Sequence, residues 1–223
     1  MRRKIPLVTG EVYHIFSKSI AGFRIFNSEA DFLRLLSGIR FFRARKPGRA
    51  LSCLLRDDPE RIVEEDRADA GSRRIQLIAY CIMQTHFHLL LRQNERNGIS
   101  DFMSLLQNSY TRYFNLKYRR KGPLWESAFK NVTIESDEQA LHVTRYIHLN
   151  PATAYLVDKA ADWKFSSYLE YLGETGHEKS ICEWAHFPIL PPRQYEKFVN
   201  DRIHHQRMLD QYKHLALEDS SVP

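Results

Sequence analysis

The hydrophobic pattern of this sequence switches between a two-residue period and a helical period, and the order of the switches constrains the fold more than any other feature. Apolar residues either alternate with their neighbours, as in a strand, or recur on one helix face. In chain order the expected elements are a strand, helix, strand, strand, helix, strand and helix, at about residues 11–16, 29–45, 75–83, 86–92, 99–121, 128–134 and 136–150. This order predicts an α+β fold of ferredoxin-like type, with helices packed on an antiparallel sheet.

Polar motifs mark the ends of the expected helices. Ser28 and Asp31 form a capping-box pattern before the first helix, and Ser136 and Gln139 form another before the third. Pro151 is expected to end the third helix, because proline lacks the amide proton that a helix interior uses.

Two regions lie outside this plan. Residues 56–71 mix acidic residues with arginine and are expected to form a solvated, partly helical insertion. A segment at 163–171 and a polar helix at about 193–215 are expected near the C-terminal end. The chain is therefore divided into a main domain at 1–175 and a mostly helical C-terminal extension at 176–223.

The composition fits a globular protein with a polyanionic partner. Hydrophobic residues make up 43% of the 223 residues, enough for a core, and the 9 Gly and 9 Pro exclude collagen-like and broadly disordered classes. The net charge of +6 and the pI of about 9.2 favour nucleic acid as a partner. Three widely spaced cysteines predict no disulfide framework. The longest apolar run is far shorter than the roughly 20 residues that cross a bilayer, so we expect a cytoplasmic protein with no membrane partner.

The His86-Phe87-His88 motif is the sharpest candidate for chemistry. Residues two apart in a strand point to the same face, so both imidazoles can approach one metal ion while Phe87 turns into the core. A pair of surface histidines on a half-exposed strand would give the same pattern. Two imidazoles also leave a divalent metal short of ligands, so further donors are needed.

The helix that ends at Asn150 offers those further groups. His142, Tyr146 and Asn150 are spaced by four residues and share one helix face. The Asn150 amide oxygen is a candidate third metal ligand, and Tyr146 lies one turn before it. The alternative is a core tyrosine followed by an asparagine that caps the helix.

A tyrosine beside a metal suits phosphoryl transfer. The hydroxyl is a weak nucleophile at neutral pH, and a divalent ion that polarises the phosphate compensates for this. Attack by Tyr146 on DNA would leave a 5′-phosphotyrosine and a 3′-hydroxyl, which can later rejoin strands without ATP. The expected DNA-binding residues are basic side chains interleaved with aromatic ones, namely Arg112, Lys117, Arg119, Arg120, Lys121 and Lys130. A solvated charged face is the simpler explanation of such a run.

The motifs together resemble a known family. The segments EVYHIFSKSIAGFRIF, THFHLLL, SLLQNSYTRYFNLKYRRKGPLWESAFK, TRYIHLNPATAYLV and WKFSSY resemble the REP-associated tyrosine transposases of the single-tyrosine His-hydrophobic-His superfamily, over about residues 10–172. The resemblance implies metal ligands at His86, His88 and Asn150, a nucleophile at Tyr146, and Mg²⁺ or Mn²⁺ as cofactor. It also implies single-stranded or hairpin DNA as substrate, handled by a monomer or homodimer.

Some residues depart from the family pattern, and other functions stay open. Gln84 and Thr85 precede the histidine pair where Pro-Asn is frequent, and Ala128 stands where Arg is frequent. By donor chemistry alone, two imidazoles and an amide suit Mn²⁺ or Zn²⁺ at least as well as Mg²⁺. A metal nuclease that uses water and a DNA-binding regulator that does not cleave are the alternatives. An RNA-binding module on the same topology would require an aromatic strand pattern that this sequence lacks.

Overall fold

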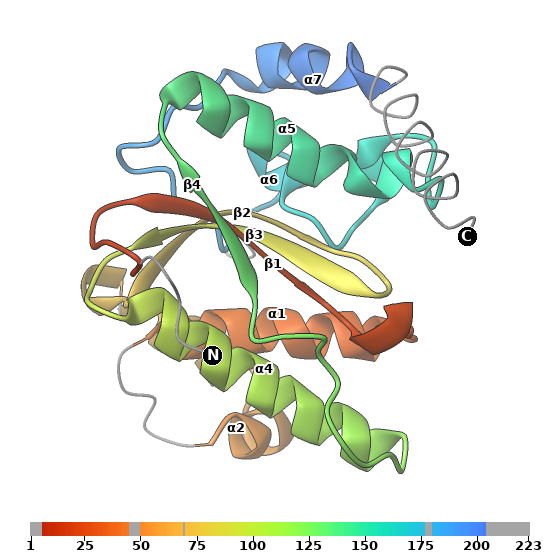
Figure 1. The fold of residues 1–223 in the computed structure, drawn as a ribbon. Coiled ribbons are helices and arrows are strands. Elements are labelled where there is room, and N and C mark those ends of the chain that lie inside the picture. The colour runs from red at the N-terminus through yellow and green to blue at the C-terminus, as the bar shows by residue number, and fades with distance from the viewer. Residues whose placement is uncertain (1–5, 45–49, 69, 177–179, 204–223) are drawn as a thin grey trace, which may run out of the picture.

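A four-stranded antiparallel sheet lies between two layers of helices (Figure 1). The computed structural model describes residues 6–44, 50–68, 70–176 and 180–203. The strands are β1 (Val12–Lys18), β2 (Ile75–Ile82), β3 (His86–Gln93) and β4 (Lys130–Ile134). The helices are α1 (Glu29–Arg43), α2 (Leu51–Asp57), α3 (Arg61–Ala68), α4 (Gly98–Lys117), α5 (Asp137–Thr153), α6 (Tyr168–Tyr171) and α7 (Pro192–Asn200), with 3-10 turns at Ile20–Gly22, Ala70–Ser72 and Ala160–Asp162.

The sheet confirms the predicted ferredoxin-like fold class. Its strand order is β2-β3-β1-β4, and every neighbouring pair is antiparallel. Helix α1, from the connection between β1 and β2, and helix α4, between β3 and β4, cover one face of the sheet (Figure 1). Helices α5, α6 and α7 lie over the other face (Figure 1). The helix pair on one face is the predicted sandwich, and α5 is the added helix.

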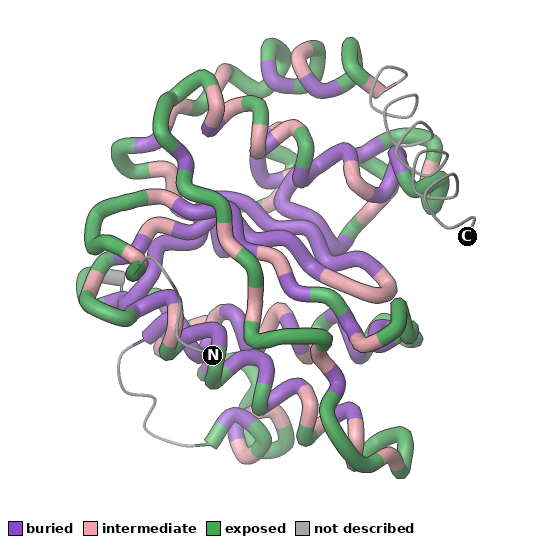
Figure 2. The backbone as a smooth tube through the Cα atoms, viewed as in Figure 1, coloured by how far each residue is buried: buried purple, intermediate pink, exposed green. Residues whose placement is uncertain are grey.

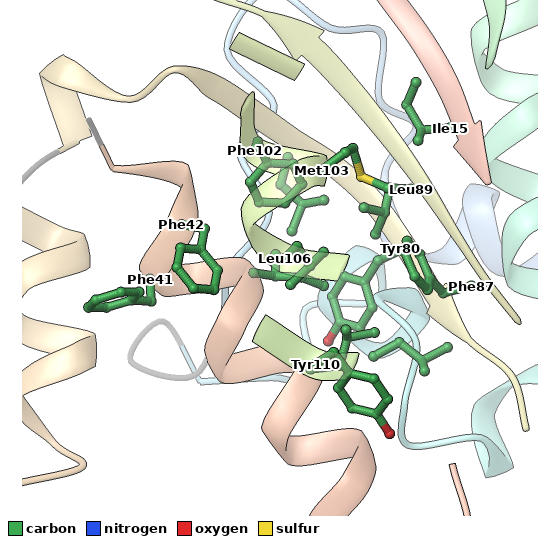
Figure 3. Close-up of a cluster of buried hydrophobic side chains, with 14 of the residues drawn as sticks. Ile15, Phe41, Phe42, Tyr80, Phe87, Leu89, Phe102, Met103, Leu106 and Tyr110 are labelled. Atoms are coloured by element: carbon green, nitrogen blue, oxygen red, sulfur yellow. The ribbon is translucent and has the colours of Figure 1, made fainter. Parts of the chain in front are cut away.

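The alternation of side chains along the strands divides the core between the two faces. Ile15, Phe87 and Leu89 point to the α1 and α4 side, where they meet Phe102 and Leu106 of α4 (Figure 3). On the other face, Leu90 packs with Ile147 of α5. Burying a residue such as Phe87 stabilises the fold by roughly 2–3 kcal/mol. The register of β3 is therefore held by its apolar residues, and His86 and His88 are left on the α5 side.

The described part of residues 56–71 is partly helical and mostly exposed, as predicted, but one of its charges is buried. These residues contain the last two residues of α2 and all of α3, and Asp66 of α3 is only 3% exposed. Asp66 accepts hydrogen bonds from Arg43 of α1 and forms an ion pair with Arg73. Asp66 is therefore not a solvated charge, although the composition of its region indicates one. Composition does not reveal a partner that is distant in the sequence, such as Arg43.

Helix α5 runs past the proline that was expected to end it. Pro151 lies inside the helix, which continues to Thr153, so the prediction of an end at Asn150 was wrong by about one turn. The chain remains helical because the following turn has its own hydrogen bonds, including that from the Ala154 amide to the Asn150 carbonyl. At the other end Ser136 accepts a hydrogen bond from the Gln139 amide, as its capping pattern predicts.

The C-terminal extension packs on the main domain through α5. Tyr195 and Val199 of α7 are fully buried, and α7 lies along α5 (Figure 1). The predicted helix at 193–215 is seen at Pro192–Asn200, and its last part, 204–215, lies outside the described residues. Among the described residues, no helix has the length and apolar character needed to cross a membrane.

Of the two edge strands of the sheet, only β4 is exposed. Strand β4 is an edge strand and is largely exposed, whereas every residue of β2, the opposite edge strand, is buried (Figure 2). The segment around Ser166 covers β2, since Cys81 and Ser166 form a bridge.

Candidate metal and nucleophile site

The two histidines of β3 lie on one face of the sheet, as their spacing predicts. The ring centroids of His86 and His88 are 5.1 Å apart, and their planes are nearly perpendicular. His88 is 4% exposed, and His86 is half-buried at the start of the strand. Phe87 between them points to the opposite face and is fully buried. The strand thus presents two imidazoles toward α5.

Each imidazole is held through its Nδ1 atom. His86 Nδ1 lies 2.9 Å from the Thr85 hydroxyl. His88 Nδ1 lies 2.9 Å from Nε2 of His14, a residue of β1. The Nε2 atoms are therefore the ring nitrogens that each side chain can offer to a ligand.

His14 is a member of this site that the sequence did not identify. It is 8% exposed, and its ring stacks on that of His88 with centroids 5.1 Å apart. Strand alternation places His14 with Val12 and Phe16 on one face, but that pattern does not say which strand lies alongside. The pairing of Phe16 with His88 across β1 and β3 brings His14 within reach.

Burial keeps the three imidazoles neutral. Desolvation lowers the pKa of His14 to about 4, and desolvation together with the charge of Lys18 lowers the pKa of His86 to about 4. The pKa of His88 is well below its ordinary value because of burial, with smaller contributions from His86 and His14. Neutral imidazole is the form that binds a metal.

Tyr146 of α5 lies directly against this histidine group. Its ring meets His14 edge-on with centroids 5.8 Å apart, and meets His88 edge-on at 5.6 Å. Tyr146 is also 39% exposed, so a large substrate can approach it. The structure thus brings Tyr146 together with the histidine pair, although the three residues come from elements about 60 positions apart in the sequence.

The other predicted members of the α5 stripe differ in their surroundings. Asn150 is half-buried, and its side-chain amide donates to the Tyr146 carbonyl at 2.9 Å, which leaves the amide oxygen for another partner. His142 instead lies beside Arg145 and the Phe198 ring. Of the stripe, Tyr146 therefore contacts the histidine group, Asn150 bonds to the Tyr146 carbonyl, and His142 contacts α7.

A metal ion bound to His86 and His88 would also need the side-chain amide oxygen of Asn150. No group of three or more His, Cys, Asp or Glu side chains in the described part of the chain could hold a metal ion. Two neutral imidazoles that each present Nε2 would nevertheless fit two positions of a divalent ion, and Asn150 would be the further protein donor, with substrate oxygens completing the set.

The basic residues predicted to bind DNA occupy two regions. Lys130 of β4 pairs with Phe16 and so shares the face of the histidine pair. The remaining five, Arg112, Lys117, Arg119, Arg120 and Lys121, lie on or just after α4, the helix on the opposite face. Lys117 forms an ion pair with the buried Asp31 at 2.7 Å, and Arg120 bonds to Asn115 and Pro123.

Lys18 is a second residue that the sequence did not single out. It is exposed at the end of β1 and is the cross-strand partner of His86, so its side chain lies on the histidine face. A strand-end lysine carries no distinctive sequence signal, and only the β1–β3 register places its charge beside the histidine pair.

Comparisons with known proteins find a related family and a related fold. Residues 55–150 match the model of the IS200-like transposase family. A solved REP-associated tyrosine transposase bound to a REP hairpin has a similar fold, with a TM-score of 0.51 and 14% identity, over 85% of this chain and 98% of that one. No match was found among curated proteins. The resemblance drawn from the sequence motifs is thus confirmed: the segment at 55–150 matches the IS200-like transposases, and the chain has the fold of a REP-associated tyrosine transposase.

Proposed function

We propose that this protein is a transposase that cleaves and rejoins single-stranded, hairpin-forming DNA with Tyr146 as its nucleophile. The observation that carries the proposal is the edge-on contact of the partly exposed Tyr146 ring with His14 and His88, beside His86. This contact places a hydroxyl-bearing side chain next to His88, whose Nε2 is available to a ligand, with the His86 ring beside it. The match of residues 55–150 to IS200-like transposases supports the same reaction class.

The reaction needs only the tyrosine and the DNA strand as reacting groups. The Tyr146 oxygen attacks the phosphorus, and a P–O bond to tyrosine forms as the bond from phosphorus to the 3′ oxygen breaks. The phenol proton passes to solvent, and the departing 3′ oxygen takes up a proton. The products are a 5′-phosphotyrosine and a 3′-hydroxyl. Attack by a 3′-hydroxyl reverses these steps and restores the tyrosine.

His86, His88 and Asn150 are the residues that would hold the metal ion, Mg²⁺ or Mn²⁺. When bound, a divalent ion polarises a phosphate oxygen and offsets the negative charge that develops in the transition state. The protein contributes two neutral imidazoles whose orientation is set before substrate arrives, since both Nδ1 atoms already have partners. Asn150 would add its amide oxygen from the helix that also carries Tyr146.

Two observations support hairpin DNA as the substrate: the positive net charge of the chain and its similarity to a transposase that was solved with a hairpin. The chain carries a net charge of +6, and the similar solved transposase was bound to a REP hairpin. Lys130 and Lys18 lie on the histidine face and are the basic residues placed to contact phosphates beside the site. Each such contact releases counterions, so binding should weaken as salt increases.

A covalent adduct is the direct test. The protein is incubated with Mn²⁺ and a 5′- or 3′-labelled hairpin with single-stranded flanks, then run on a denaturing gel. Tyr146→Phe should lose the adduct and reduce cleavage by a factor on the order of 10³ or more, because the nucleophilic oxygen is missing. Tyr155→Phe, which alters another exposed tyrosine, should behave as wild type.

The same gel separates the alternatives. Cleavage without an adduct in both wild type and Tyr146→Phe would mean that water is the nucleophile. Tight binding with neither cleavage nor adduct would mean a regulator that does not cleave. Either result would contradict the proposal.

A further inference from the structure

The hydrogen bond between the His14 and His88 rings determines which ring nitrogen of His88 carries the proton. His88 Nδ1 and His14 Nε2 are 2.9 Å apart within a buried site, and two neutral imidazoles can share that contact only if one donates and the other accepts. If His14 donates, His88 accepts at Nδ1 and carries its proton on Nε2. If His14 accepts, His88 donates from Nδ1 and its Nε2 lone pair is available.

Only one of these two arrangements is compatible with a metal ligand. His88 Nδ1 is occupied by His14, so His88 can bind an ion only through Nε2, which must then be unprotonated. His86 likewise has Nε2 as its available nitrogen, since its Nδ1 lies 2.9 Å from the Thr85 hydroxyl. Among the described residues, the Nδ1 partners of His86 and His88 are a hydroxyl and an imidazole, so a third imidazole holds His88 where a carboxylate or a carbonyl usually would.

We propose that His14 is a positioning residue of this site: its unprotonated Nε2 accepts the Nδ1 proton of His88 and so holds His88 in the tautomer that presents Nε2 to a metal ion. This inference rests on the proposed function for its consequence, the metal affinity, but the tautomer itself can be measured without metal or DNA.

Two substitutions distinguish this positioning role of His14 from a purely structural role as a packing ring. The His14 ring stacks on His88 and meets Phe16 and Tyr146, so it also fills space. His14→Phe keeps a ring and loses the acceptor nitrogen. His14→Gln loses the ring, but its amide oxygen can occupy the place of Nε2 and accept the proton. If His14 matters as an acceptor, Gln should preserve function better than Phe, and if it matters as a packing ring, the order should be reversed.

The first measurement is the tautomer of His88 in metal-free protein. Long-range ¹H–¹⁵N spectra distinguish a proton on Nδ1 from one on Nε2, and the signals of His88 are assigned by their loss in His88→Gln. We expect the Nδ1–H form in wild type and in His14→Gln, and a substantial Nε2–H population in His14→Phe. A predominant Nε2–H form in wild type would overturn the inference.

The second measurement is Mn²⁺ affinity without DNA, followed by calorimetry or by the loss of the free-ion paramagnetic signal. His14→Phe should bind Mn²⁺ roughly 10 to 100 times more weakly than wild type, and His14→Gln should recover most of that loss. Equal affinities for wild type and His14→Phe would overturn the positioning role. Thermal unfolding of each variant confirms that the folded protein is compared.

The two measurements separate this inference from the proposed function. If wild type bound no Mn²⁺, the metal part of the proposed function would fail, while the spectra would still show whether His14 sets the tautomer. If wild type bound Mn²⁺ but both His14 variants bound it equally well, the proposed function would stand and the inference about His14 would be wrong.

Discussion

At the scale of single residues, the site depends on side chains whose charge state is set by burial. His14, His86 and His88 lose the ability to hold a proton at neutral pH because they are removed from water, and the pKa values of His14 and His86 fall to about 4. Three neighbouring cations would repel one another and any metal ion. Neutral rings instead leave positive charge to Lys18 at the open end of the group.

Removing either metal-ligand candidate should separate cleavage from binding. We expect His86→Ala and His88→Ala to reduce hairpin cleavage by about 100-fold or more, since each removes a ligand donor. Hairpin affinity should change by less than about threefold, because phosphate contacts supply most of the binding free energy. Cleavage assays and fluorescence anisotropy on the same variants check this, and a parallel loss of both properties would argue for a structural role.

Lys18 provides a prediction about DNA binding. Lys18→Ala should weaken hairpin binding and reduce the slope of log affinity against log salt by about 0.7–1, the effect of one phosphate contact. Lys197→Ala is a matched control, since it removes the same charge from an exposed position on α7. Anisotropy titrations between low and moderate salt compare the two, and equal slopes for both variants would exclude a specific contact at Lys18.

At the scale of elements, one buried carboxylate, that of Asp31, joins the start of α1 to the end of α4. Asp31 near the start of α1 accepts hydrogen bonds from Tyr113, Lys117 and Tyr118 at the end of α4. It also accepts the Ser28 amide proton, which is half of the predicted capping box. One carboxylate therefore caps α1 and fastens α4 to it. Lys117, predicted from its neighbours to bind DNA, has an internal partner here.

The carboxylate of Asp31 makes stability depend on pH in a defined direction. Burial alone raises its pKa, but hydrogen bonds from Lys117, Tyr118 and Tyr113 outweigh that effect and lower the pKa from 3.8 to about 2. A lowered pKa stabilises the folded state above about pH 4, and this contribution is lost as the pH falls through 2. Asp31→Asn should therefore cost on the order of 2 kcal/mol of unfolding free energy at pH 7.

Urea unfolding of wild type and Asp31→Asn across pH 2–7 measures this contribution. The difference in unfolding free energy should shrink steadily as the pH approaches 2, since wild-type Asp31 becomes protonated there. A difference that stayed constant over this range would contradict the assignment of Asp31 as an ionised group with stabilising partners.

At the scale of the whole molecule, the C-terminal segment is connected to the helix that carries Tyr146. His148 of α5 is fully buried, and its two ring nitrogens lie 2.7 Å from Tyr195 of α7 and from Ser167. Glu183 forms ion pairs with Arg43 and Arg73 on the other side of the sheet. The extension thus contacts both helical layers, and α7 supports α5 from outside.

Tyr195→Phe tests that connection. Removal of the hydroxyl leaves a buried nitrogen of His148 without this partner, so the protein should lose about 1–3 kcal/mol of stability. Tyr155→Phe, at a position that is 60% exposed, should change stability by less than about 0.5 kcal/mol. Thermal and urea unfolding give both values. A second, separate transition at residues 176–223 would show instead that the extension folds independently of the main domain.

Much of the architecture follows from local patterns in the sequence. The two-residue period of β3 determines that His86 and His88 share a face, because successive side chains of a strand point in opposite directions. The helical period of α5 determines that Tyr146 and Asn150 lie one turn apart on one side. The order of strands and helices restricts the sheet to few topologies, and the ferredoxin-like one is observed.

Which of these faces meet depends on how distant segments pack. His14 and Lys18 join the histidine pair because β1 pairs with β3 in one register, and a pattern of period two specifies the faces of a strand but not its neighbour. Asp66 and Lys117 have buried or internal partners from distant segments, whereas their sequence surroundings indicate solvated charge. Local patterns are enough to predict the elements and the faces of the chemical groups. Which groups share a site depends on long-range packing, because contacts between distant segments leave no periodic trace in either segment.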